Sequence, residues 1–128
     1  MGELSEELIA DILRKMNFEV TLTPQTRDGG KDIIVKSNNV IAESVWFVQC
    51  KHYSLDKPVG IAVFREVVGT HLLNKPNKSI IVTSSYYTKE VINEVEKVKN
   101  IINIKDYKAV FNWIDWVTEG ERIDNTFL

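Results

Sequence analysis

Three short apolar runs near the amino terminus constrain the fold of this chain more than any other feature. The runs Ile33-Ile34-Val35 and Val45-Trp46-Phe47-Val48 are too short for ordinary helices, and the polar turn Ser37-Asn38-Asn39 lies between them. An earlier run from Phe18 to Leu22 ends before Pro24. Apolar runs of this length, bounded by turn residues, predict strands over residues 18–22, about 32–36 and about 45–51.

Apolar residues recur at helical spacing outside these strands. Ser5 is a plausible N-cap of a first helix over residues 3–16. Thr88 similarly caps a helix that extends to Val98, and Gly120 is the expected stop of a helix over 108–119. A helix over 60–74 and strands over 79–83 and 101–104 complete the set. This order predicts an α/β fold, a mixed central β-sheet with helices on both faces.

The length and composition are those of an ordinary globular domain. The chain has 128 residues, of which 44% are hydrophobic and 27% charged, so we expect a single domain over 1–128. Residues 121–128 have little pattern and are expected to fray or to begin a linker. One cysteine excludes an intramolecular disulfide. With no secretory or membrane-spanning pattern, we expect a cytoplasmic protein.

The net charge of −2 argues against a general polyanion binder, but the charges are unevenly distributed. Residues 27–78 carry eight Lys or Arg against five Asp or Glu. A locally basic segment in an acidic chain suits local contact with phosphate better than long-range attraction.

The same segment carries an acid, an amide and a lysine on two neighbouring strands. Asp32 opens one strand, and Gln49 and Lys51 lie at the end of the next. Because side chains alternate along a strand, Gln49 and Lys51 share a face and Cys50 points to the other. Carboxylate and amide oxygens hold hard divalent cations, and an ammonium steadies a phosphate or an attacking water. The pattern indicates a metal-dependent site.

Together these features resemble the Mrr-like restriction endonuclease domain, a branch of the PD-(D/E)xK nuclease superfamily. The resemblance implies a restriction-endonuclease-like three-layer fold and a Mg²⁺-dependent DNA endonuclease, with Mn²⁺ as a substitute metal. The matching stretches, in the family's order, are Glu6 to Leu13, Asp28 to Ile33, Val48 to Tyr53, Val59-Gly60 with Arg65-Glu66, and Ile81 to Thr88.

The resemblance also implies roles for individual residues. Asp32, Gln49, Lys51 and Glu6 are implied as the catalytic set, with Asp32, Gln49 and Glu6 as the metal ligands. Gln49 stands where most of the superfamily carries an acid, which removes one negative charge from the cation site. Helical spacing supports Glu6 independently, because Glu6 shares the core-facing stripe of its helix with Ile9 and other apolar residues.

Each of these residues also has a purely structural interpretation. Asp32 can close a turn, Lys51 can extend to solvent from a strand end, and Gln49 can bond a neighbouring strand. Glu6 can pair with a nearby lysine, including Lys51. Cys50 is most simply a small buried hydrophobe.

Contacts with nucleic acid are predicted for Lys31, His52, Arg65, Ser84 and Ser85. Ser84 and Ser85 lie between a buried strand and a helix, where hydroxyls and N–H groups bind anions, although helix capping explains them nearly as well.

The expected partner is DNA. A homodimer is expected because cleaving both strands usually needs two sites, and target choice is assigned to another domain or subunit. Two alternatives stay open: a non-catalytic nucleic-acid-binding or oligomerisation domain that kept the fold, and a junction-resolving nuclease.

Overall fold

The computed structural model describes the backbone of residues 5–23, 32–38 and 42–127, and their side chains except those of residues 32, 38 and 120–127. The helices are α1 (Glu6–Lys15), α2 (Ile61–Asn74), α3 (Lys89–Val95), a 3-10 turn (Glu96–Val98) and α4 (Tyr107–Phe127). The strands are β1 (Glu19–Leu22), β2 (Asp32–Asn38), β3 (Glu43–Lys51), β4 (Lys78–Thr83) and β5 (Ile102–Lys105).

The five strands form one mixed sheet in the order β1-β2-β3-β4-β5. The pairs β1–β2 and β2–β3 are antiparallel, whereas β3–β4 and β4–β5 are parallel. The middle strand, β3, therefore joins an antiparallel meander to a parallel half whose strands are connected through helices. The mixed sheet expected from the sequence is confirmed.

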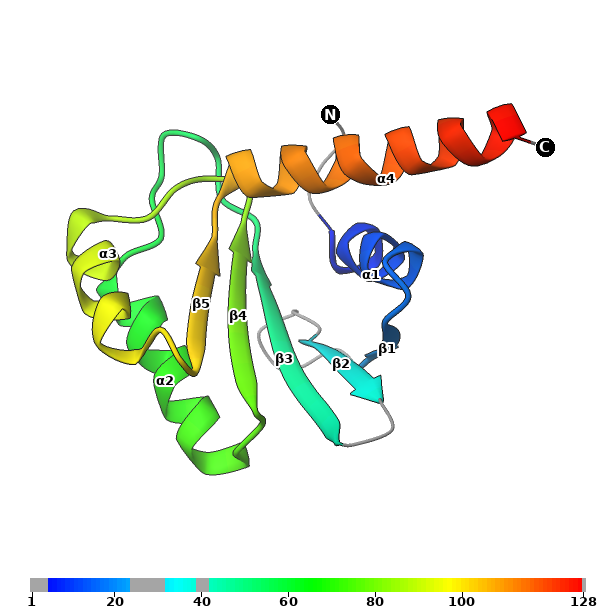
Figure 1. The fold of residues 1–128 in the computed structure, drawn as a ribbon. Helices are drawn as coiled ribbons and strands as arrows, with labels where there is room; N and C mark the ends of the chain where they lie inside the picture. Colours follow the sequence, from blue (N-terminus) through cyan, green and yellow to red (C-terminus); the bar gives the residue numbers. More distant parts are fainter. Residues whose placement is uncertain (1–4, 24–31, 39–41, 128) are drawn as a thin grey trace.

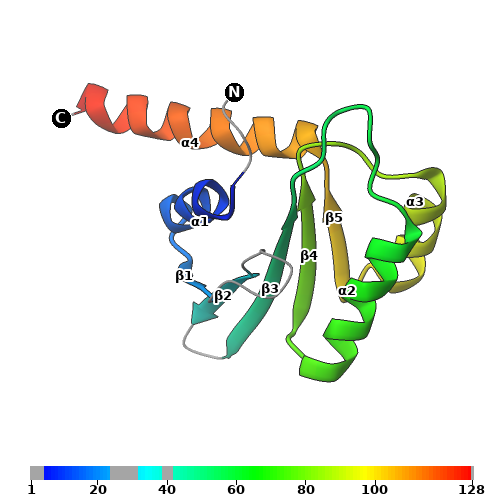
Figure 2. The same ribbon diagram turned by 180° about the vertical axis from the view of Figure 1, so that it is seen from behind.

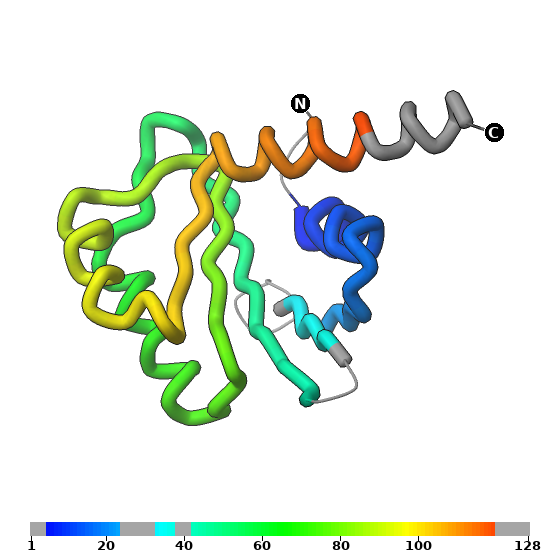
Figure 3. Tube along the Cα trace, in the orientation of Figure 1, coloured from blue at the N-terminus to red at the C-terminus, as the bar shows by residue number. Residues whose placement is uncertain are grey.

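Helices cover the two faces of this sheet, which gives three layers (Figures 1 and 2). On one face α1 and α4 enclose a buried cluster that includes Ile9, Val48 and Val82. On the other face α2 and α3 enclose a second cluster that includes Phe64, Ile81 and Val91. The trace in Figure 3 shows α1 beside the meander and α2 and α3 beside the parallel half.

Local sequence signals explain where two of the helices begin. The Ser5 hydroxyl accepts a bond from the Leu8 backbone N–H at 3.0 Å, and the Thr88 hydroxyl accepts one from Val91 at 3.3 Å. Each hydroxyl satisfies an N–H group that has no partner inside its own helix. Both capping predictions are confirmed.

The last helix does not stop where the sequence predicted. Helix α4 runs from Tyr107 to Phe127, so the expected end at Gly120 is wrong. A glycine inside a helix costs about 1 kcal/mol relative to alanine, which is too little to end a helix by itself. Across the described residues, no helix combines the length and apolar composition needed to cross a membrane.

The second cluster supplies a test of how much the core stabilises the fold. Ile81 is fully buried, whereas Ile92 on α3 is 50% exposed. Ile81→Ala should lower the free energy of unfolding by about 2–5 kcal/mol, because it removes buried apolar surface and leaves a cavity. The matched variant Ile92→Ala should change it by no more than about 1 kcal/mol. Urea denaturation measures both values, and equal losses would contradict the assigned core.

Candidate active site at the carboxyl end of strand β3

The pairing of β2 with β3 sets Asp32 directly opposite Gln49. On the other side of β3, Gln49 is in register with Ile81 and Lys51 with Thr83. Directly opposed residues of an antiparallel pair have Cβ atoms about 5 Å apart and point to the same face. Two residues that lie 17 positions apart in sequence are thus neighbours on the sheet. The side chain of Asp32 is outside the described set, so this placement is one of backbone.

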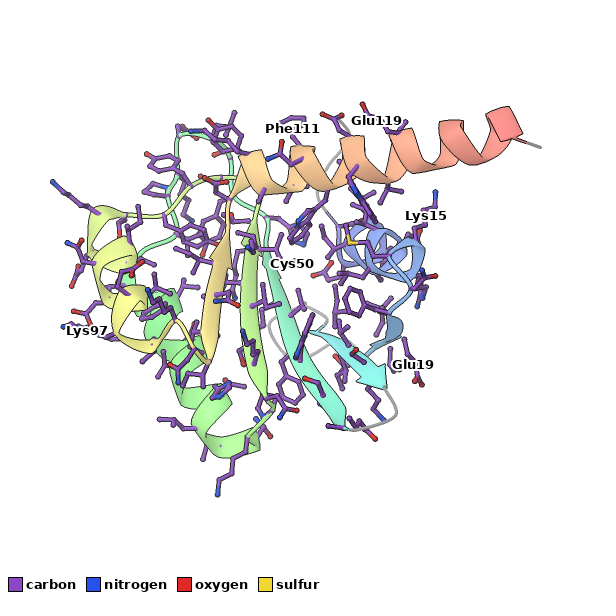
Figure 4. All side chains as sticks on the ribbon, in the orientation of Figure 1. Lys15, Glu19, Cys50, Lys97, Phe111 and Glu119 are labelled. Carbon is purple, nitrogen blue, oxygen red and sulfur yellow. The ribbon has the colours of Figure 1, made fainter. Side chains whose placement is uncertain are left out.

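The two faces of β3 have different surroundings. Val48 and Cys50 are buried in the cluster beneath α1 and α4, and Cys50 is labelled in Figure 4. By alternation, Gln49 and Lys51 point to the opposite face, and both are partly buried. The interpretation of Cys50 as a small buried hydrophobe is confirmed.

Glu6 reaches the same end of β3 from the side of α1. Its side chain is only 13% exposed, and its Oε1 atom lies 3.2 Å from Nε2 of His52, which directly follows Lys51. Among the described residues Glu6 therefore contacts His52, whereas the structural interpretation of the sequence was a nearby lysine, including Lys51. A carboxylate from the first turn of α1 thus lies at the strand end that carries Gln49 and Lys51.

Three consecutive hydroxyls, on the last residue of β4 and the two residues after it, hold the loop that follows Lys51. Thr83 Oγ1 donates to the Lys51 carbonyl at 2.9 Å, and Ser84 Oγ donates to the Tyr53 carbonyl at 2.8 Å. Ser85 Oγ donates to the Lys57 carbonyl at 2.6 Å. We call these three residues the hydroxyl clamp. It positions the loop of residues 52–60 between β3 and α2.

The clamp changes the interpretation of Ser84 and Ser85. Ser85 is fully buried, and both hydroxyls donate to backbone carbonyls of the loop. Burial of Ser85 argues against direct contact between its hydroxyl and a phosphate. The sequence placed these serines between a strand and a helix, but it could not place the loop carbonyls beside them.

The clamped loop presents groups that the sequence did not single out. The ammonium of Lys57 lies 4.6 Å from the centre of the Tyr53 ring, a cation–π contact, and Lys57 is exposed. The Ser54 hydroxyl donates to the Asp56 carboxylate, and this bond lowers the pKa of Asp56. Lys57 is thus a cation held near the strand end.

The buried Tyr87 side chain bonds to backbone carbonyls of both β4 and β5. Its hydroxyl donates to the carbonyls of Ile81 at 2.8 Å and Lys105 at 3.0 Å. Burial raises the pKa of Tyr87 far above its ordinary value, so the phenol stays protonated and acts as a donor.

Among the other residues predicted to contact nucleic acid, Arg65 is exposed on α2. His71 is buried, and its Nδ1 atom lies 2.8 Å from Ser79 Oγ, which accounts for both polar groups. Lys31 lies outside the described residues.

The donor set suits a hard cation chemically. Glu6 offers a carboxylate, Gln49 an amide oxygen, and Asp32 a second carboxylate beside Gln49 in the register. Among the side chains that the structure describes, no group of three or more His, Cys, Asp or Glu residues is arranged to hold a metal. A cation site here therefore depends on Asp32 and on the neutral Gln49.

Comparison with known proteins identifies relatives of this fold. A restriction endonuclease family model, Mrr_cat, matches residues 2–114. The chain is similar to the uncharacterized protein y4cE of Sinorhizobium fredii, with 24% identity over 93 residues, covering 73% of this chain and 24% of that protein.

Two solved structures share the fold. The DNA modification-dependent restriction endonuclease AspBHI matches with a TM-score of 0.63 and 16% identity, over 88% of this chain and 34% of that chain. The MspJI restriction endonuclease, solved in complex with a 27-mer oligonucleotide, matches with a TM-score of 0.57 and 14% identity, over 80% of this chain and 24% of that chain. The chain thus spans between a quarter and a third of the length of these enzymes. The restriction-endonuclease-like fold is confirmed.

The hydroxyl clamp can be tested by removing one hydroxyl without changing the shape of its side chain. Thr83→Val removes the donor to Lys51 and also the acceptor for the Ser85 backbone N–H. Leaving these buried groups unpaired should cost about 1–3 kcal/mol of unfolding free energy. Amide hydrogen exchange should accelerate in residues 52–60 more than in β4 itself.

Thr83→Ser is the matched control, because it keeps the hydroxyl and loses only a methyl group. It should leave exchange in the loop close to that of the wild type. Equal acceleration in both variants would show that the methyl group, and not the hydroxyl, holds the loop.

Proposed function

Because this chain belongs to the restriction endonuclease family, we propose that it is a divalent-metal-dependent endonuclease domain that hydrolyses phosphodiester bonds in DNA. One observation carries the proposal beyond family membership. The register sets Asp32 opposite Gln49, and Lys51 follows on the same face of β3. An acid, an amide and an ammonium at one strand end are the groups that metal-assisted hydrolysis of a phosphodiester requires.

In the proposed mechanism, Asp32, Glu6 and the amide oxygen of Gln49 would hold Mg²⁺, with Mn²⁺ as a substitute. Such an ion would lower the pKa of a bound water and neutralise charge that builds on the phosphate. The ammonium group of Lys51 would orient the attacking water or stabilise the charge of the transition state. His52 holds the Glu6 carboxylate at the strand end through the 3.2 Å contact.

The charge of the proposed site is set by Gln49. An amide contributes a ligand oxygen but no negative charge, so two carboxylates carry the electrostatic attraction for the cation. Weak metal binding is therefore an expected property of this site. The presence of Gln49 in place of an acid also motivates the alternative function, a nucleic-acid-binding domain that has lost hydrolysis.

DNA contact is proposed at the clamped loop and its surroundings. Lys57 and His52 are exposed at the strand end, and Lys31 and Arg65 remain candidates for phosphate contact. Ser84 contributes by holding the loop through the Tyr53 carbonyl.

The proposed partners follow from this role. MspJI was solved with an oligonucleotide and AspBHI is named as modification-dependent, which supports DNA as the substrate class. Target choice is assigned to another domain or subunit, and a homodimer would cleave both strands. The site is proposed to act in the cytoplasm.

Removing the proposed catalytic groups should abolish cleavage of plasmid DNA in Mg²⁺ or Mn²⁺. Lys51→Ala should lower the rate by about 10²–10³-fold, because it removes an electrostatic contact to the transition state. Asp32→Ala should lower it at least as much. An agarose-gel time course with linear, supercoiled and branched DNA measures the rates.

Lys36→Ala is the matched control, because Lys36 is an exposed lysine on the neighbouring strand β2. It should cleave at the wild-type rate. Binding without cleavage by the wild type in either metal would favour the non-catalytic alternative, and a marked preference for branched DNA would favour a junction-resolving enzyme. Equal cleavage by all variants would reveal a contaminating nuclease.

Gln49→Glu tests the proposed metal ligand by adding a negative charge to the site, where the other variants remove a charge. A third carboxylate should strengthen Mn²⁺ binding, lowering the dissociation constant by about tenfold, which corresponds to roughly 1.4 kcal/mol. Isothermal titration with Mn²⁺ in the absence of DNA measures this change. Gln49→Leu, which offers no oxygen, should weaken binding, and equal affinity in both variants would remove Gln49 from the metal site.

A further inference from the structure

A cavity of about 260 Å³ lies on the sheet face that α1 and α4 cover. Its lining comes from α1, the sheet and α4, and includes Ile9, Trp46, Val48 and Trp113. Trp46 and Val48 alternate with Phe47 and Gln49 along β3, so the cavity opens on the face opposite to Gln49 and Lys51. It is separate from the candidate active site.

The wall of the cavity is largely aliphatic, and three aromatic side chains also line it. The rings of Phe18 and Trp46 lie 5.3 Å apart between centroids at an angle of 51°, and Trp113 contributes a third aromatic side chain from α4. Aromatic walls bind flat rings through stacked or edge-to-face contacts, and such stacking is how proteins hold nucleobases without reading their sequence.

The polar residues that line the cavity are two lysines and one asparagine. Lys78 and Lys105 are partly exposed, and neither forms an ion pair with any described residue. The lining includes no Asp or Glu, and the Asn103 amide N–H group donates to the Lys99 and Ile102 carbonyls. Two ammonium groups that pair with no described acid, beside three aromatic side chains, favour a ligand that is both flat and anionic, although the chain as a whole is acidic.

The dimensions limit the size of that ligand. An apolar cavity of about 150 Å³ is enough to bind benzene, and pockets for drug-sized ligands begin at about 300 Å³. A cavity of about 260 Å³ therefore holds one ring system, and the sugar and phosphate of a nucleotide would extend from it toward a lysine. Lys78 lies beside Trp46 in the register, and Lys105 pairs with Val82, four residues further along β4. The two lysines are therefore about 13 Å apart along the strand direction, and both line the cavity.

We propose that this cavity binds a nucleoside monophosphate, with the base against Phe18, Trp46 and Trp113 and the phosphate paired with Lys78 or Lys105. The site lies on the far face of β3 from Gln49 and does not depend on the proposed nuclease activity. A bound nucleotide would contact α1, which carries Glu6.

The test is a titration of the full chain with deoxynucleoside monophosphates in EDTA, which removes divalent metal from the candidate active site. Two of the three tryptophans line the cavity, whereas Trp116 is 62% exposed outside it. Tryptophan fluorescence in a Trp116→Phe background should therefore be quenched saturably, with a dissociation constant at or below about 1 mM. Isothermal titration supplies a second readout.

Variants then assign the ligand contacts. Of the variants Lys78→Met and Lys105→Met, the one that removes the lysine paired with the phosphate should raise the dissociation constant about fivefold. The double variant should raise it at least as much. Both lysines are partly exposed, so these changes should leave the circular dichroism spectrum intact. Lys97→Met is the matched control, because Lys97 lies in the 3-10 turn after α3, on the other side of the sheet, and is 71% exposed (Figure 4).

Titrations with other ligands distinguish binding of the whole nucleotide from binding of its phosphate or its nucleoside alone. Inorganic phosphate and the unphosphorylated nucleoside should each bind more weakly than the nucleotide. Stronger binding of octanoate than of any nucleotide would identify a site for aliphatic acids and overturn the proposal. Absence of saturable quenching, or unchanged affinity in the double lysine variant, would overturn it as well.

Discussion

The pairing of β3 with a different neighbour on each side is the constraint on which the rest of the structure depends. Its antiparallel bonds to β2 set Asp32 opposite Gln49, and its parallel bonds to β4 set Lys51 beside Thr83. A slip of one residue in either register would turn every side chain of β3 to the other face. Burial of Val48 and Cys50 under α1 prevents such a slip, so packing on one face determines the chemistry available on the other.

This arrangement gives the molecule two chemically distinct surfaces. One face of β3 presents an amide and an ammonium at a strand end, next to an exposed loop. The opposite face presents the cavity between α1 and α4. Glu6 connects the two, because it belongs to the helix on the cavity side but contacts His52 at the strand end. The position of α1 therefore bears on both surfaces.

The elements of the fold were predictable to within a few residues, because hydrophobic period and caps are local. Ser5 and Thr88 mark helix starts through bonds that reach only three residues. The end of α4 was not predictable in this way, since a single glycine does not outweigh a long helix. Ser84 and Ser85 show the other limit, because a hydroxyl in sequence has no known acceptor until the fold supplies one.

The sequence by itself determined the order of strands and helices, the shared face of Gln49 and Lys51, and the buried character of Cys50, because alternation and periodicity are properties of the local backbone. Only the tertiary structure decided that Glu6 contacts His52, that the hydroxyl clamp holds the loop after Lys51, and that Phe18, Trp46 and Trp113 line one cavity. These contacts join residues far apart in the chain, and their geometry depends on how the layers pack on the sheet.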